Sequence, residues 1–265
     1  ELEAALTPDA RCAKRMDHIQ TLFQVLSAAR RLVGHLGIAR DNMTRGRCAR
    51  LWQEWPEAMA AGQGMLDGTP PPDGLAGRLA FLAEADRLKS VLRASTLCDG
   101  SRRENSAEHS WHLALYALVM APVAGPEVDI GRVIRMLILH DLVEIDTGDV
   151  PIHALNGAAH HGAAQLAAEE AAAERLFGLL PQPLRAELHA LWAEFEANET
   201  PDAVFAKSLD RAQPVMQNIA CGGGSWIEYR VTYEQLVERV GQRIQRGAPT
   251  LWTWLDESAR GFFAR

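Results

Sequence analysis

Residues 135–144 read Arg-Met-Leu-Ile-Leu-His-Asp-Leu-Val-Glu, an apolar stretch that ends in three ionisable side chains. In a helix, Leu137 shares a face with His140 and Asp141, which follow it by three and four residues. Glu144 reaches the same face, three residues after Asp141. An imidazole and two carboxylates on a buried face are costly unless they are paired, hydrogen-bonded or bound to a metal. The stretch therefore predicts a functional site.

The composition is that of an ordinary globular protein: of the 265 residues, 48% are hydrophobic and 23% are charged. This length allows one large domain, or a medium-sized domain with a smaller companion. The formal net charge of −7 argues against a broad binding surface for nucleic acid polymers. It does not argue against a small anionic substrate that a few arginines hold.

The sequence predicts a soluble, cytoplasmic protein. No basic segment followed by an apolar one stands at the start, so no signal peptide is expected. The longest apolar run, 113–125, contains a proline and is too short to cross a membrane. The four cysteines are scattered, which argues against a cysteine zinc site and a disulfide framework: Cys12, Cys48, Cys98 and Cys221.

The apolar spacing is helical throughout and strand signals are nearly absent, so we predict an all-α fold, a helical bundle with a small helical N-terminal extension. Residues 8–39 should form one long helix or two, and residues 47–59 another. The Gly- and Pro-rich segment 62–74 is the clearest linker. We therefore divide the chain into an N-terminal region, 1–74, of unreadable function and a main domain, 75–265.

The main domain should place its polar residues on several helices. Ser106 is the predicted N-cap of a helix that runs to about Met120. The helix of His140 follows, and Gly148 and Pro151 end that region. The remaining predicted helices cover residues 163–180 and 184–198, the segment after Pro201 that carries Asp210, and two or so segments after the glycine loop 221–224.

Four side chains form a candidate metal site: His109, His140, Asp141 and Asp210. Two imidazoles and two carboxylates suit a divalent ion such as Mn²⁺, Fe²⁺, Co²⁺, Ni²⁺ or Zn²⁺. Adjacent residues of a regular helix diverge by about 100°. His140 and Asp141 can therefore both reach one ion only where the helix turns and both side chains bend inward.

The pattern His…His-Asp…Asp resembles that of the HD-domain metal-dependent phosphohydrolases. Residues 104–110, Glu-Asn-Ser-Ala-Glu-His-Ser, are similar to a segment of the bacterial HD-domain 5'-deoxynucleotidases. Residues 140–149, His-Asp-Leu-Val-Glu-Ile-Asp-Thr-Gly-Asp, are similar to a second. Residues 191–196 and 207–210 resemble two later blocks. The resemblance extends over roughly 79–254 and leaves out the first 75 residues.

The resemblance implies a role for each matching residue. His109, His140, Asp141 and Asp210 match the ligands of one divalent ion, whether Mn, Co, Fe, Ni, Zn or Mg. Glu144 matches the catalytic carboxylate that orients or deprotonates the attacking water. Two further residues match contacts to the substrate: Arg93 to the phosphate and Asp149 to the sugar hydroxyl.

The implied activity is removal of the 5'-phosphate from nucleoside monophosphates, most of all deoxynucleotides. In the bacterial nucleotidases an aromatic residue follows the arginine, whereas Ala94 follows Arg93 here, so the base and sugar preference stays open. Family members are often dimers, and the apolar, tryptophan-bearing C-terminus is compatible with a homodimer. No nucleic acid polymer and no membrane is expected as a partner.

Two other functions stay open. One is a nucleoside triphosphohydrolase or a two-metal HD enzyme, an oxygenase or phosphodiesterase, in which histidines such as His160 and His161 bind a second ion. The other is a non-catalytic HD module that binds a nucleotide. The presence of every expected ligand and of Glu144 argues against the last. For Arg93, a solvated charge on a helix surface is nearly as good an interpretation.

Overall fold

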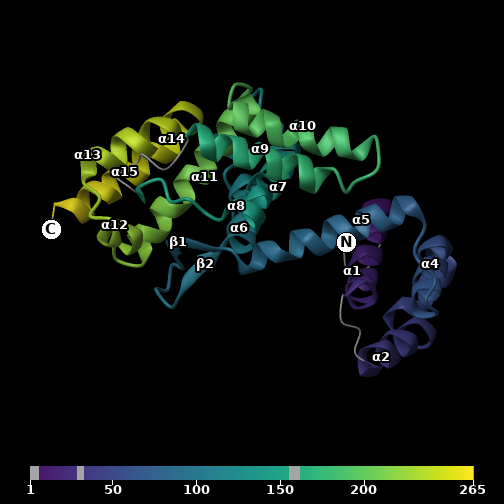
Figure 1. Cartoon of the computed structure of the whole chain (residues 1–265). Coiled ribbons are helices and arrows are strands. Elements are labelled where there is room, and N and C mark those ends of the chain that lie inside the picture. Colours follow the sequence, from purple (N-terminus) through teal and green to yellow (C-terminus); the bar gives the residue numbers. More distant parts are fainter. Residues whose placement is uncertain (1–5, 29–32, 155–161, 265) are drawn as a thin grey trace. The chain divides into compact units, whose positions relative to one another are not determined.

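The computed structural model describes residues 6–28, 33–154 and 162–264 (Figure 1). Helices make up most of these residues, and the sheet among them has two short strands, so the predicted all-α class is confirmed. The chain divides into two compact units. One comprises Glu1–Ala83 with Leu179–Pro181, and the other comprises Glu84–Gly178 with Gln182–Arg265.

The first unit is a small helical cluster. Its described helices are α1 (Pro8–Ser27), α2 (Val33–Thr44), the 3₁₀ helix η1 (Arg47–Arg50), α3 (Leu51–Glu54), α4 (Pro56–Leu66) and most of α5 (Asp73–Asp86). Their apolar faces meet in one core, which comprises Ile19, Leu22, Phe23, Leu26, Ala39, Met43, Cys48, Leu51, Ala58, Met59, Met65 and Leu79. Burial of these side chains supplies the unit's main stabilisation.

The segment boundaries in this unit differ in part from those predicted. The single helix predicted over 47–59 is wrong: Trp55 interrupts it, because Pro56 begins a new helix and disfavours helical backbone in the residue before it. The predicted linker is partly helical, since α4 continues to Leu66 and α5 begins at Asp73. The assignment of 1–74 as a separate region remains a prediction.

The second unit begins with a hairpin and the helices that carry the polar motifs. Strands β1 (Leu92–Thr96) and β2 (Arg103–Asn105) pair antiparallel, with Leu92 opposite Asn105 and Thr96 opposite Arg103 (Figure 1). The sequence pattern did not predict this hairpin. The other elements here are the 3₁₀ helices η2 (Arg87–Ser90), η3 (Ala121–Val123) and η4 (His140–Val143), and the α-helices α6 (Ser106–Val119), α7 (Ile130–Leu139) and α8 (Glu144–Thr147).

The rest of the second unit is helical. It consists of α9 (Ala163–Phe177), α10 (Leu184–Ala197), α11 (Pro201–Ala220), α12 (Gly224–Glu228), α13 (Tyr233–Leu236), the π-helix η6 (Val237–Gly241), α14 (Gln242–Gly247) and α15 (Pro249–Phe263). The predicted helices 163–180 and 184–198 are thus found within one to three residues of their predicted ends. Among the described residues, none of the helices combines the length and apolar character needed to cross a membrane.

Helix α11 is the central element of the second unit. It packs against α6, α7, α10, α14 and α15, and buries polar residues as well as apolar ones. Thr200 caps its first turn by accepting a hydrogen bond from the Ala203 N–H, and Pro201 stands at its first position. Phe205 and Leu209, which lie on one face of the turn that leads to Asp210, are buried. The core therefore holds this carboxylate in place.

Candidate metal centre and active site

The helix that carries the polar trio is not continuous. α7 ends at Leu139, His140 and Asp141 lie in the 3₁₀ turn η4, and Glu144 begins α8. The expectation of one regular helix through 135–144 is therefore wrong, whereas the inward bend needed for adjacent residues is present. The His140 Nε2 lies 2.9 Å from Oδ1 of Asp141, so the two neighbours turn toward each other.

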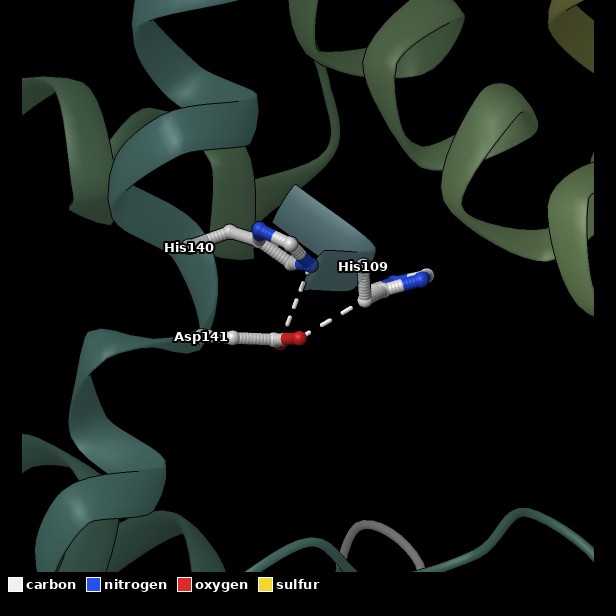
Figure 2. Close-up of side chains that lie close together, drawn as sticks. All are labelled: His109, His140 and Asp141. Carbon is white, nitrogen blue, oxygen red and sulfur yellow. Dashed lines mark ion pairs between the residues drawn. The ribbon is translucent and has the colours of Figure 1, made fainter. Parts of the chain in front are cut away.

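His109 approaches this pair from α6 (Figure 2). Its Nε2 lies 3.8 Å from Oδ2 of Asp141, and its ring centroid is 5.5 Å from that of His140. Figure 2 shows the Asp141 carboxylate facing both imidazoles. All three side chains are buried, and among the described residues they form a group whose ligand atoms lie close enough together to hold one metal ion.

Asp210 joins the group from α11. Its Oδ1 lies 3.1 Å from Nε2 of His109 and 3.8 Å from Nε2 of His140. Burial would raise the pKa of Asp210, but the charge of Arg211 and the two neighbouring imidazoles hold it well below its ordinary value. The structure thus brings together all four residues that the sequence singled out as metal ligands.

The hydrogen bonds of the two imidazoles favour a cation between them. The Nδ1 of His140 lies 2.9 Å from the carbonyl oxygen of Leu137, which can only accept, so Nδ1 carries a proton. The Nδ1 of His109 lies 3.1 Å from Oε1 of Gln213 and carries a proton for the same reason. In each neutral ring, Nε2 then presents a lone pair to the carboxylates, an arrangement that requires positive charge there.

A proton can supply that charge in place of a metal. Burial would lower the pKa of His140, but the negative charges of Asp141 and Asp210 raise it to about 10. The Nε2 of His140 is buried without a well-oriented hydrogen-bond acceptor. Since metal ligands must release their protons on binding, this nitrogen and the carboxylates beside it fit a divalent cation.

A second layer of hydrogen bonds orients His109. The Nε2 of Gln213 donates to Oε1 of Glu104, at 2.9 Å, and to Nδ1 of His112, at 3.2 Å. Gln213 therefore turns its carbonyl oxygen to His109. Gln217 also donates to Oε1 of Glu104, at 2.9 Å. Such outer contacts fix the orientation of a metal-binding imidazole.

The sequence pattern did not predict these roles of Gln213 and Glu104. The spacing in the sequence could have indicated Gln213, because it follows Asp210 by three residues and so lies on the same helix face. His112, three residues after His109, contacts Gln213 and packs edge-on against Tyr116.

Glu144 lies beside the metal group and is held by two donors. Its Oε2 accepts a hydrogen bond from Oγ of Ser106 at 2.5 Å, and its Oε1 lies 3.3 Å from Nη1 of Arg93. Burial raises the pKa of Glu144, the charge of Asp141 raises it further, and Arg93 opposes both, so the pKa stands well above its ordinary value. A carboxylate with a raised pKa is a stronger base.

Ser106 is not the cap of α6. Asn105 is the N-cap: its side chain accepts from the Glu108 N–H, and the Glu108 side chain accepts from the Asn105 N–H. The capping box leaves the Ser106 hydroxyl, which is fully buried, to donate to Glu144. The predicted helix was therefore correct and the predicted cap was wrong by one residue.

Replacing Ser106 with alanine should lower kcat about tenfold, because a hydrogen bond to a charged group is lost and Glu144 gains freedom. Steady-state kinetics would measure the change. Ser110→Ala is the matched control, since Ser110 lies one turn along the same helix with a buried hydroxyl that makes no hydrogen bond. Equal activity losses in both variants would contradict the role given to Ser106.

Arg93 is a buried strand residue. The interpretation as a solvated helix charge is wrong, because Arg93 lies in β1 and is 8% exposed. Its Nη1 lies 2.7 Å from Oδ2 of Asp141 and 3.6 Å from Oδ1 of Asp149. The other oxygen of Asp149 accepts from the Ala94 N–H at 3.2 Å. The structure therefore places Arg93 and Asp149 together, next to the metal group.

A cavity opens onto these residues from within the second unit. His140, Asp141, Glu144 and Asp210 line it together with Arg93, Ala94, Gly148 and Asp149. Arg102 and Arg103 are absent from its wall and form exposed ion pairs with Glu108 and Glu228. His160 and His161 lie outside the described residues, so the alternative of a two-metal enzyme stays open.

Comparison with known proteins decides the family. The family model for the HD domain matches residues 85–252. The chain belongs to the HD-domain family. The matched range contains His109, His140, Asp141 and Asp210. The resemblance to the HD-domain phosphohydrolases that the motifs predicted is therefore confirmed.

Several relatives of this HD-domain protein carry the name 5'-deoxynucleotidase. The 5'-deoxynucleotidase HDDC2 of Mus musculus is 31% identical over 144 residues, which cover 54% of this chain and 68% of the mouse protein. The 5'-deoxynucleotidase of Erwinia tasmaniensis is 26% identical over 173 residues, 62% of this chain and 86% of that protein.

A solved structure is more similar in sequence. It is that of a predicted metal-dependent phosphohydrolase from Magnetospirillum magnetotacticum MS-1, with 44% identity and a TM-score of 0.66. The match covers 73% of this chain and all of the other. These similarities identify the HD-domain protein as an enzyme of the phosphohydrolase group, as its motifs predicted.

Proposed function

We propose that this HD-domain enzyme removes the 5'-phosphate from deoxynucleoside monophosphates with the help of one divalent metal ion. The observation that carries the proposal is the shared cavity, in which Glu144 and Arg93 lie against the cluster of His109, His140, Asp141 and Asp210. The names of the relatives support the substrate class.

The proposed roles follow from chemistry and position. The four clustered residues hold the metal, which when bound lowers the pKa of a water molecule and polarises a phosphoryl oxygen. Glu144 accepts the proton of the attacking water, and Ser106 fixes the direction of its carboxylate. Arg93 contacts the phosphate through its guanidinium. Asp149 accepts a hydrogen bond from the sugar hydroxyl.

A phosphate-release screen tests the proposal. The purified protein, loaded in turn with Mn²⁺, Co²⁺, Zn²⁺, Ni²⁺, Fe²⁺ or Mg²⁺, is offered deoxy- and ribonucleoside mono-, di- and triphosphates. We expect inorganic phosphate and nucleoside from the deoxynucleoside monophosphates. Absence of hydrolysis with every metal would exclude the enzyme function, and inorganic triphosphate as a product would replace it with triphosphohydrolase chemistry.

A cytoplasmic location and a homodimer also belong to this proposal. All four cysteines are free thiols, which is compatible with a reducing compartment. Apolar side chains such as Trp111, Leu118 and Trp254 are more than half exposed, as a protein interface would require. Light scattering of the purified chain would measure its mass, and a monomer at micromolar concentration would contradict the dimer.

A further inference from the structure

The cavity wall carries basic side chains besides Arg93. Arg211, on α11, and His153, in the segment after α8, line the same cavity as the metal group. Neither residue belongs to the set inferred from the family resemblance. Arg239, on the π-helix η6, lies behind His153 with its Nη1 3.4 Å from the Nδ1 of the imidazole. Two basic side chains thus line the cavity from separate segments, and Arg239 contacts one of them.

The charge of Arg93 is already balanced by acids. Its Nη1 lies within 3.6 Å of carboxylate oxygens of Asp141, Glu144 and Asp149. Burial would lower the pKa of Arg93, but these negative charges raise it well above its ordinary value. A phosphate dianion next to Arg93 alone would meet more negative than positive charge. A further cation on the cavity wall would offset this repulsion.

Arg211 is placed to supply that charge. It follows Asp210 in sequence, is 13% exposed, and has its Nε 3.7 Å from Oδ2 of Asp210. A group that lies beside the metal cluster on the cavity wall can contact a phosphoryl oxygen of a substrate held there. Arg243 on α14 lies close enough to Arg211 that this charge adds to burial in lowering the pKa of Arg243.

His153 offers a neutral donor beside Arg211. It is 9% exposed. Since Arg239 can only donate, the Nδ1 of His153 accepts from it and the Nε2 carries the proton. Burial and the charges of Arg239 and Arg211 lower the pKa of His153 to about 4, so the imidazole is neutral near pH 7. The Nε2–H is then a hydrogen-bond donor that suits an anionic oxygen.

We propose that Arg211 and His153, with Arg239 orienting His153, form an anion subsite that binds oxygens of the substrate's phosphoryl group. The inference rests on the proposed function and adds contacts that the family resemblance does not name. Arg93 and Arg211 would then contact the phosphoryl group from two separate elements, β1 and α11. Arg239 is a positioning residue, because it acts through His153.

Binding of inorganic phosphate to the metal-loaded full chain tests the subsite without requiring turnover. Isothermal titration calorimetry is done on wild type, Arg211→Gln, Arg211→Lys, His153→Ala and the control Arg135→Gln. Arg135 is an exposed arginine of α7 that pairs with Glu187, away from the cavity wall. Metal content is measured on each sample.

We expect Arg211→Gln to weaken phosphate binding by about 10- to 100-fold and His153→Ala by about fivefold, the range for lost charge-assisted and neutral hydrogen bonds. Arg211→Lys should recover part of the affinity, and Arg135→Gln should bind as wild type does. Wild-type affinity in both Arg211→Gln and His153→Ala would overturn the proposal. The proposal would also be overturned if Arg211→Gln lost phosphate affinity only in proportion to its loss of metal while His153→Ala bound phosphate as wild type does.

The outcomes separate the two proposals. If phosphate affinity depends on Arg211 and His153 but no nucleotide is hydrolysed, the subsite stands and the proposed enzyme function fails. If deoxynucleotides are hydrolysed while neither substitution alters phosphate binding, the function stands and the subsite fails. Should Arg211→Gln not fold, His153→Ala and Arg239→Gln test the subsite from two other elements.

Discussion

Glu144→Gln should lower kcat by about 10²- to 10⁴-fold while the protein keeps its metal, the range found when a general base is removed. Glutamine preserves the shape of the side chain and can still accept the Ser106 hydrogen bond, but it cannot take a proton. The side-chain contacts of Glu144 are to Arg93 and Ser106, neither of which belongs to the metal-binding set, so metal affinity should change little. Steady-state kinetics and metal analysis measure the two quantities.

Glu187→Gln is the control for this substitution. Glu187 is a half-exposed residue of α10 whose ion pair with Arg135 lies at the surface, and its loss should leave kcat unchanged. If Glu144→Gln retained wild-type turnover, another group would have to accept the proton. A loss of turnover that was accompanied by loss of metal would show instead that Glu144 serves the metal site.

Asp210→Asn should weaken metal binding by more than about a hundredfold and abolish turnover, since replacement of outer-layer groups alone costs 10- to 100-fold. The substitution removes a negative charge that lies 3.1 Å from Nε2 of His109 and 3.8 Å from that of His140. Metal titration against a competing chelator would measure the affinity. Equal metal affinity in Asp210→Asn and wild type would contradict the ligand set.

Asp202→Asn provides the matched control on the same helix. Asp202 is buried near the start of α11, where it accepts hydrogen bonds from the Asp129 N–H and from Nε of Arg132. Its replacement removes the same charge from α11 and should reduce thermal stability without altering metal affinity. Reduced metal binding in this variant would mean that Asp210 acts through the stability of the helix.

Much of the local structure could be predicted from the sequence. Apolar spacing places the helices that carry His109 and Asp210, and Pro201 marks the start of α11. The spacing Asn-x-x-Glu at 105–108 is a capping-box pattern, and the cap is Asn105 instead of the predicted Ser106. These features depend on neighbours along the chain, which the sequence displays directly.

Arg93 shows what local pattern cannot decide. Nothing nearby in sequence distinguishes a helix-surface arginine from a buried one, and its strand exists because β2 pairs with β1. Its carboxylate partners Asp141 and Glu144 lie 48 and 51 residues further along the chain. The same holds for the Gln213 contact to His109, which spans 104 residues. Such pairs depend on how whole elements pack.

The sequence by itself determined the all-α class, the HD-domain family and the four residues expected to bind a metal, because periodicity and motif spacing are properties of neighbouring residues. Only the tertiary structure decided that the chain turns at His140 and Asp141, that Ser106 donates to Glu144, and that Arg211 and His153 face the same cavity. Burial and charge at a site are set by segments distant in sequence, so they appear only when the helices pack.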